Sequence, residues 1–307
     1  MPNPIYMIDA SSLKKSSCLL RLQRNNILGL RLKALHSYKM AYGTAFHKFL
    51  QHWYNGEGFD AAWAAARDYY APHTTNLPEE AFHTGSHLER AVKLYADTFP
   101  EGGDMLVPRR SQDGKAMQEW KFSFPWHKGS NFELALCGTI DMLASYAGQE
   151  PIVDHKTSSS FQKDSYFQTY ELDIQTMLYS YVCKEFLGFS HYPPVLINGL
   201  FLKRPTAKAE KAGYFDGAEF RRSNLISYSD AQMANFVGWL EQKKQDIITF
   251  LESGVSRWPA DFAACKQSFS LCDYWQLCRQ GSDQEVEEAI IEQNYNKSPY
   301  NPLAFQD

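Results

Sequence analysis

Two apolar segments, residues 134–143 (LALCGTIDML) and 151–156 (PIVDHK), carry charged side chains at their ends, and this combination constrains the fold most. Their apolar runs predict two buried strands. The polar stretch SYAGQE between them is turn-like, so an antiparallel hairpin is the simplest connection. Side chains alternate along a strand, so Asp154 and Lys156 share one face and His155 points to the other.

Pairing of the two strands would bring Asp141 and Asp154 side by side at one end of the hairpin. Two carboxylates at that distance repel each other unless a cation lies between them. Their hard oxygens suit Mg²⁺ or Mn²⁺, and Lys156 would stabilise negative charge beside such an ion. An isolated Asp-x-Lys is more often a surface salt bridge, but charges at the ends of buried strands need a compensating partner. The pattern therefore favours a divalent-metal site.

The rest of the hydrophobic pattern predicts a mixed α/β fold, in which a short mixed sheet is flanked by helices. Expected helices cover residues 11–39, 43–54, 58–71, 79–98, 171–187 and 228–253, and further strands cover 117–126 and 194–203. We expect a single domain over residues 1–307, with a helical N-terminal part (1–115), a core (116–205), a helix with a cysteine cluster (206–280) and an acidic tail (281–307).

Charge is distributed unevenly along the chain, although its net value is only −4. No acidic residue lies between Asp9 and Glu57, a window that holds eight lysines and arginines. Such a window is either a solvated helix face or a contact for phosphate groups, for which Arg21 and Arg24 are the first candidates. No apolar run reaches the roughly 20 residues of a membrane span. The N-terminus also lacks a signal-peptide pattern, so we expect a cytoplasmic protein.

Six cysteines are present, and three of them, Cys265, Cys272 and Cys278, lie within fourteen residues. A cytoplasmic chain of this size seldom has a disulfide framework, so this spacing indicates a metal site. Cys18, in a Ser-Ser-Cys stretch between basic residues, is the candidate for a fourth ligand. Thiolates suit an iron–sulfur cluster or zinc, and the residues alone do not separate the two. We interpret Cys137 and Cys183 as buried small hydrophobic residues.

The segments GTAFH, GTIDML, IVDHKTS and QTMLYSY, in this order, resemble four motifs of the RecB-like exonuclease branch of the PD-(D/E)XK nuclease superfamily. The resemblance spans residues 18 to 278 and implies a restriction-endonuclease-like core. It implies that Asp141 and Asp154 bind the metal and that Lys156 is the catalytic lysine. It also implies metal ligation by the backbone carbonyl of His155 and by His47, which would otherwise be a packed histidine on an amphipathic helix.

The same resemblance implies roles for three further residues. Gln175 and Tyr179 lie four residues apart on one helix face, which would look onto the active site and the DNA strand. The alternative is an ordinary, partly buried helix. Glu119 lies where some relatives supply an extra acidic ligand, and the alternative is an edge-strand glutamate that faces water.

Iron–sulfur branches of this group use one early and three late cysteines, which implies a 4Fe–4S cluster on Cys18, Cys265, Cys272 and Cys278. Six residues separate the first two late cysteines here, whereas the common spacing in the group is two. The last interval of five residues agrees with that group. The cluster would be structural, because it closes a loop over almost the whole chain. Zinc is the alternative.

The expected function is hydrolysis of DNA phosphodiester bonds by a Mg²⁺- or Mn²⁺-dependent exonuclease, acting on single strands or duplex ends. The sequence has neither a P-loop nor an HExxH motif, which disfavours an NTPase or a zincin. The nuclease would act alone or with a separate helicase, a recombinase or CRISPR-adaptation proteins. Two alternatives stay open: a catalytically inactive DNA-binding or assembly subunit with the same fold, and a zinc-stabilised RNA-processing enzyme.

Overall fold

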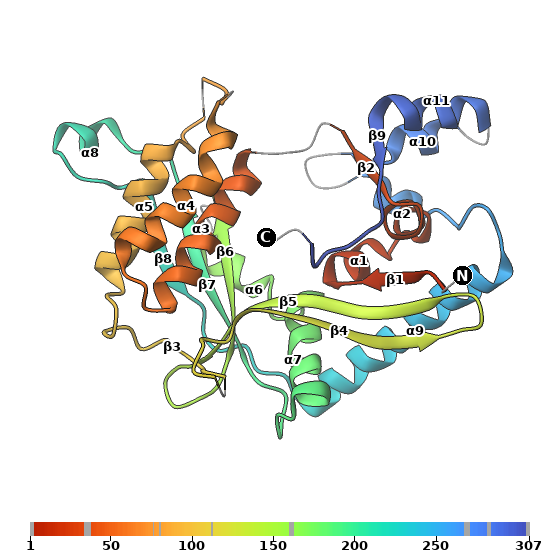
Figure 1. Cartoon of the computed structure of the whole chain (residues 1–307), viewed down its shortest axis with the longest axis horizontal. Helices are drawn as coiled ribbons and strands as arrows, with labels where there is room; N and C mark the ends of the chain where they lie inside the picture. The colour runs from red at the N-terminus through yellow and green to blue at the C-terminus, as the bar shows by residue number, and fades with distance from the viewer. Residues whose placement is uncertain are drawn as a thin grey trace. The chain divides into compact units, whose positions relative to one another are not determined.

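The computed structural model describes residues 3–33, 38–75, 77–79, 81–111, 113–159, 163–266, 271–280 and 284–304 (Figure 1). The chain forms two compact units. Unit 1 comprises residues 1–35, 121–139 and 229–307, and unit 2 comprises residues 36–120 and 140–228. The sequence suggested consecutive parts, whereas these units interleave along the chain. Strand β5 (Glu133–Ser145) belongs to unit 1 at its start and to unit 2 at its end.

The sheet of unit 2 contains the predicted hairpin. The end of β5 pairs antiparallel with β6 (Ile152–Ser158), and β6 pairs parallel with β7 (Val195–Leu202). Strand β7 then pairs antiparallel with β8 (Ala218–Arg222), and β3 (Val107–Pro108) pairs with the end of β5. Every residue of β7 is buried, as expected for an apolar strand covered on both faces. With the unit 1 strands that pair with β5, the described sheet is mixed and seven-stranded.

Three helices cover β6, β7 and β8 in unit 2: α3 (Tyr38–Tyr54), α4 (Phe59–Tyr70) and α5 (Gly85–Thr98) (Figure 1). Aromatic residues of α3 and α5, such as Phe46 and Tyr95, pack in one core with Val153 and Leu200 of the sheet. Shorter helices are η2 (Ala71–Thr74), α6 (Lys163–Gln168) and α8 (Ala207–Lys211). Helix α7 (Ile174–Leu187) starts at the N-cap Asp173 and ends at Gly188, whose φ of 75° suits glycine.

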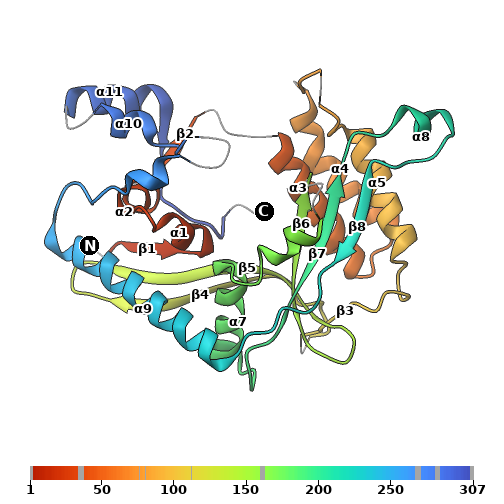
Figure 2. The ribbon, with the colours of Figure 1, turned by 180° about the vertical axis from the view of Figure 1, so that it is seen from behind.

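Unit 1 contains β1 (Ile5–Ile8), which runs parallel to the start of β5, and most of β4 (Gln118–Lys128). Helices α1 (Ala10–Lys15) and α2 (Leu19–Leu22) follow β1, and a π-helical turn, η1 (Gln23–Ile27), continues α2. The long helix α9 (Asp230–Ser253) begins with a capping box of Ser229 and Gln232. In Figure 2, α9 follows β4 on the side away from α1 and α2.

The C-terminal part of unit 1 packs on its N-terminal part. It contains η3 (Phe262–Cys265), α10 (Trp275–Arg279), α11 (Gln284–Asn294) and β9 (Tyr295–Lys297). Strand β9 pairs antiparallel with β2 (Leu30–Leu32). A small core of Leu30, Cys272, Tyr274, Leu277 and Tyr295 joins these segments. Residues from the two ends of the sequence therefore form one structure.

Most predicted elements are confirmed, since α3, α4, α7, α9 and the strands β4 to β7 lie where the patterns indicated. The predicted helix over residues 11–39 is wrong in its length. It breaks into short helices and ends at Gly29, whose φ of 64° suits glycine, before the strand β2. Residues 34–37 of that prediction lie outside the described residues. Strands β1, β2, β3, β8 and β9 were not predicted. In the described part of the chain, no helix is both long and apolar enough for a membrane crossing.

Candidate active site

The hairpin of unit 2 brings Asp141 and Asp154 together. Met142 pairs with Val153 and Leu143 with Ile152, so the same register continued by one residue sets Asp141 opposite Asp154. Both carboxylates are buried, and Asp154 is 1% exposed. The prediction that these two aspartates meet at adjoining strands is confirmed by this geometry.

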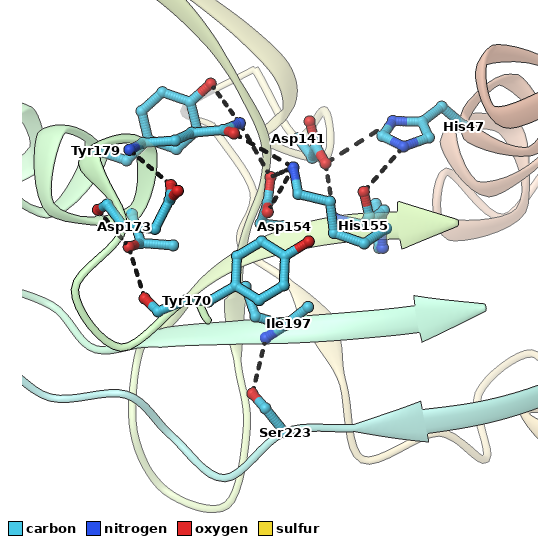
Figure 3. A network of polar contacts seen from close by, with 12 residues as sticks. His47, Asp141, Asp154, His155, Tyr170, Asp173, Tyr179, Ile197 and Ser223 are labelled. Carbon is cyan, nitrogen blue, oxygen red and sulfur yellow. Dashed lines mark hydrogen bonds and ion pairs between the residues drawn. The ribbon is translucent and has the colours of Figure 1, made fainter. Parts of the chain in front are cut away.

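The backbone of His155 connects the sheet with helix α3. Its N–H donates a hydrogen bond of 2.7 Å to Oδ2 of Asp141. Its carbonyl oxygen accepts a hydrogen bond of 3.0 Å from Nε2 of His47 (Figure 3). A close approach of α3 to β6 makes the second contact feasible. A Cβ atom added at Gly43 would lie 3.0 Å from Oγ1 of Thr157, which explains the glycine one turn before His47.

Glu119, His47 and Asp141 form a group of possible metal ligands, and their ligand atoms all lie within 4.8 Å of one another. Nδ1 of His47 is 3.8 Å from Oε1 of Glu119 and 3.8 Å from Oδ2 of Asp141. These distances are too long for hydrogen bonds. Two ligands bonded to one Mg²⁺ at about 2.1 Å stand at most about 4.2 Å apart, so both spacings fit a shared cation.

Glu119 has an unusual backbone and an unusual carboxylate. Its φ of 47° is positive, which costs a residue with a side chain roughly 1–2 kcal/mol. Its Oε2 atom is buried and has no hydrogen-bond partner among the described residues. Strain and an unsatisfied buried oxygen at one residue are typical of functional sites. Both observations favour the prediction of an extra acidic ligand over a water-facing glutamate.

Lys156 lies on the same face as Asp154, as strand alternation predicted. Its Nζ atom is 2.9 Å from Oδ1 and 2.7 Å from Oδ2 of Asp154. Gln175 on α7 accepts from Lys156 at 3.4 Å and donates from Nε2 to Oδ1 of Asp154 at 3.3 Å. The same Nε2 lies 3.1 Å from the hydroxyl of Tyr179, so the two helix residues face the site together.

The electrostatics of the site favour a bound cation. Burial raises the pKa of Asp154 to about 6 against the opposing effect of Lys156. Burial also raises the pKa of Asp141, and Glu119 adds to this shift while His47 opposes it. Burial alone would lower the pKa of His47, but Asp141 and Glu119 outweigh it and raise this pKa to about 9. A protonated His47 therefore stabilises the negative charge of Asp141 and Glu119, as a bound metal ion would.

A buried polar network behind the site was not predicted. Nδ2 of Asn198, on β7, lies 3.0 Å from Nδ1 of His155 and 3.0 Å from the hydroxyl of Tyr95. The network continues through Tyr54 to Asp104, which forms an ion pair of 2.6 Å with Arg222. Among these residues, only Asn198 gave a sequence signal, as the one polar side chain within the apolar run VLINGLFL.

The four cysteines of the predicted cluster all lie in unit 1, where Cys18, Cys265 and Cys272 are connected by contacts of the backbone. The backbone N–H of Asp261 contacts Sγ of Cys18 at 3.4 Å, and Sγ of Cys265 contacts the Asp261 carbonyl at 3.9 Å. The N–H of Cys272 donates to the carbonyl of Cys265 at 2.9 Å. Burial raises the pKa of Cys265, and the charges of Cys278 and Cys18 add to the shift, as expected for nearby thiols.

Cys137 on β5 and Cys183 on α7 are both buried, as the sequence indicated. Burial raises the pKa of both thiols, which keeps them uncharged.

The two arginines predicted to contact phosphate have different positions. Arg24 is 1% exposed, and its guanidinium contacts the Tyr274 carbonyl, Sγ of Cys278 at 3.0 Å and Glu287 at 2.8 Å. The prediction of a phosphate contact is therefore wrong for Arg24, because the side chain is buried and its guanidinium is bonded to partners within the protein. Arg21 is partly exposed and lines a surface hollow with other basic residues.

The fold and the acidic site define a class of nuclease-like α/β proteins, and comparisons with known proteins give the family. The family model described as PD-(D/E)XK nuclease superfamily matches residues 11–279. No curated protein matches the chain significantly. A crystal structure named "Putative exonuclease", from Eubacterium rectale, aligns over 90% of this chain and 88% of that chain, with 14% identity and a TM-score of 0.49. The chain belongs to the PD-(D/E)XK nuclease superfamily, and its fold is restriction-endonuclease-like.

Proposed function

We propose that this nuclease-superfamily chain is a divalent-metal-dependent deoxyribonuclease, and that it acts as an exonuclease on single strands or duplex ends. The observation that carries the proposal is the convergence of His47, Glu119 and Asp141 within 4.8 Å. This group lies beside the Asp154–Lys156 pair, which supplies a further carboxylate and an ammonium group.

The residues of this site fit Mg²⁺ or Mn²⁺. Asp141, Glu119 and Asp154 offer hard carboxylate oxygens, and His47 offers Nδ1, while the carbonyl of His155 holds the other ring nitrogen of His47. The unpartnered Oε2 of Glu119 gives independent support, because a buried carboxylate oxygen requires a positive partner. A divalent ion bound there would polarise the scissile phosphate and lower the pKa of a nearby water molecule.

The side chains around this ligand set would hold and stabilise the substrate. The carboxylate of Asp154 raises the pKa of Lys156 against the lowering effect of burial, so the lysine is charged at neutral pH. A charged Lys156 would orient water and stabilise the negative charge that grows on the phosphate. Gln175 contacts both Lys156 and Asp154 and would keep the ammonium group in place, with Tyr179 beside it. DNA duplexes would be opened by a separate protein, such as a helicase.

A cleavage assay with Mn²⁺ and end-labelled DNA tests this proposal. The wild-type protein should shorten free-ended single strands progressively, and end-blocked or circular DNA should persist. Lys156→Ala should lower kcat by about 100-fold or more, whereas Lys208→Ala, an exposed lysine on α8, should have no effect. If the wild type binds DNA but leaves every substrate intact, the chain is a DNA-binding or assembly subunit instead. Preferential cleavage of RNA would contradict the choice of DNA.

We also propose that Cys18, Cys265, Cys272 and Cys278 hold a 4Fe–4S cluster. Thiolates suit both an iron–sulfur cluster and zinc. The proposal of iron–sulfur is supported by the sequence resemblance, because one early and three late cysteines are the arrangement of the iron–sulfur branches. The buried guanidinium of Arg24 beside Cys278 would offset the negative charge of the thiolates.

Metal analysis of protein purified without oxygen tests the cluster. We expect a brown protein with about four irons and four sulfides per chain and broad visible absorption, and we expect Cys272→Ser to lose the colour. Control variants Cys137→Ser and Cys183→Ser should keep it. A colourless protein with one equivalent of zinc would replace iron–sulfur by zinc, and a protein with neither metal would contradict both assignments.

A further inference from the structure

Unit 1 has a basic hollow outside the candidate active site. Its volume is about 420 Å³ and it is open to solvent. It is lined by Ser11, Lys14, Lys15, Ser17, Arg21, Ala264 and Lys266. Helices α1 and α2 provide one wall, and the segment around η3 provides the other. We refer to this feature as the basic hollow.

The lining of the basic hollow is strongly positive. Three lysines and one arginine line it, and no carboxylate does among the described residues. Positive charges crowded in this way repel one another, and a bound anion relieves the repulsion.

Contacts within unit 1 hold the two walls together. The N–H of Leu20 donates to the carbonyl of Pro259 at 3.0 Å, and the N–H of Asp261 contacts Sγ of Cys18 at 3.4 Å. Nζ of Lys15 donates to Oδ1 of Asn25 at 3.0 Å, which fixes this lysine in the hollow. A site that exists before its ligand arrives loses little conformational freedom on binding.

The lining indicates which kind of anion fits. Ammonium, guanidinium and hydroxyl donors together are the groups that contact phosphate oxygens in protein–DNA complexes. Ser11 and Ser17 provide the hydroxyls and are exposed. An open hollow also admits a phosphate that belongs to a longer strand.

We propose that the basic hollow binds a phosphate group of the DNA strand. This inference rests on the proposed nuclease function for its choice of ligand. The phosphate is either internal to the backbone or a terminal 5′-phosphate, and both present the same chemistry to the lysines.

DNA affinity measured without divalent metal tests the basic hollow apart from catalysis. The variant Lys14→Gln/Lys266→Gln removes two charges from the hollow. The control Lys128→Gln/Lys297→Gln removes two charges from exposed lysines elsewhere in unit 1. Kd values come from the fluorescence anisotropy of a 3′-labelled 20-nucleotide single strand. We expect the hollow variant to weaken binding about tenfold, with the salt-dependence slope of log Kd reduced by about 0.7 per lost phosphate contact.

The remaining arms of the experiment separate the sources of phosphate. An equal loss for oligonucleotides with and without a 5′-phosphate assigns the hollow to the backbone, and a loss confined to the phosphorylated strand assigns it to the DNA end. The inference is overturned if the hollow and control variants bind DNA equally. It is also overturned if the hollow variant keeps the wild-type affinity for DNA and differs only in how inorganic phosphate competes with the strand. Because no cleavage is measured, a wild type that fails to cut DNA would leave this test unaffected.

Discussion

Asp141 accepts a hydrogen bond of 2.7 Å from the backbone N–H of His155, and the backbone carbonyl of His155 accepts a hydrogen bond from His47. One residue of β6 therefore aligns a carboxylate from β5 and an imidazole from α3. This arrangement gives the ligand set its shape before any ion binds, and it lets the charge of Asp141 be tested apart from its structural hydrogen bond.

The variant Asp141→Asn keeps an oxygen that can accept from His155 but removes the negative charge. We expect its far-UV circular dichroism to match that of the wild type. Its affinity for Mn²⁺, measured by calorimetry, should fall by about 100-fold or more, because a hard anionic ligand is lost. The same affinity for Mn²⁺ in both proteins would exclude Asp141 from the ligand set.

Glu119 is expected to contribute to metal binding at the expense of stability. Glu119→Gly removes both the carboxylate and the cost of the positive φ, whereas Glu119→Gln removes the carboxylate alone. Urea unfolding should therefore show the glycine variant to be more stable than the glutamine variant by about 1 kcal/mol. Both variants should bind Mn²⁺ more weakly than the wild type. A glycine variant less stable than the glutamine variant would argue against backbone strain at this position.

The stability of the metal-free protein should depend on pH through His47. Its pKa is raised from 6.5 to about 9 in the folded state, so the protonated histidine stabilises the fold fully below about pH 6.5. This contribution is lost as the pH rises through about 9. We expect the Tm in EDTA to fall across this window more steeply for the wild type than for His47→Gln.

Saturating Mg²⁺ should raise the Tm most at the alkaline end of that window, because the ion and the proton compete for one site. Parallel Tm curves for the wild type and His47→Gln would contradict the raised pKa.

The buried network behind His155 should be important for stability as well as for the site. Asp104→Asn leaves the guanidinium of Arg222 without its charged partner, and both side chains are at most 10% exposed. Removing one partner of a buried ion pair typically costs about 3–5 kcal/mol, which urea unfolding can measure. A cost below about 1 kcal/mol would show that the pair is solvated.

Sequence reasoning predicted the elements whose periodicity is strong. Their apolar runs predicted β5, β6 and β7. Strand alternation fixes which side chains share a face, so the spacing of Asp154 and Lys156 predicted that both lie on the same face of β6. Glu119 could not be assigned, since its positive φ turns the side chain in a way that alternation does not describe.

Arg24 shows a second limit of sequence reasoning. It lies in a window without acidic residues, but the fold brings Glu287 and Cys278 to its guanidinium from the other end of the chain. Charge patterns describe neighbours in sequence, and these partners are more than 250 residues away. The network of Tyr54, Asp104 and Arg222 was missed for the same reason.

The active site on the β5–β6 hairpin is tested most directly by the rate of Mn²⁺-dependent cleavage of a free-ended DNA strand by the wild type, Asp154→Asn and Lys208→Ala. We predict cleavage by the wild type and Lys208→Ala at equal rates, and a loss of about 100-fold or more in Asp154→Asn. Cleavage by Asp154→Asn at the wild-type rate would contradict the assignment of the active site to this hairpin.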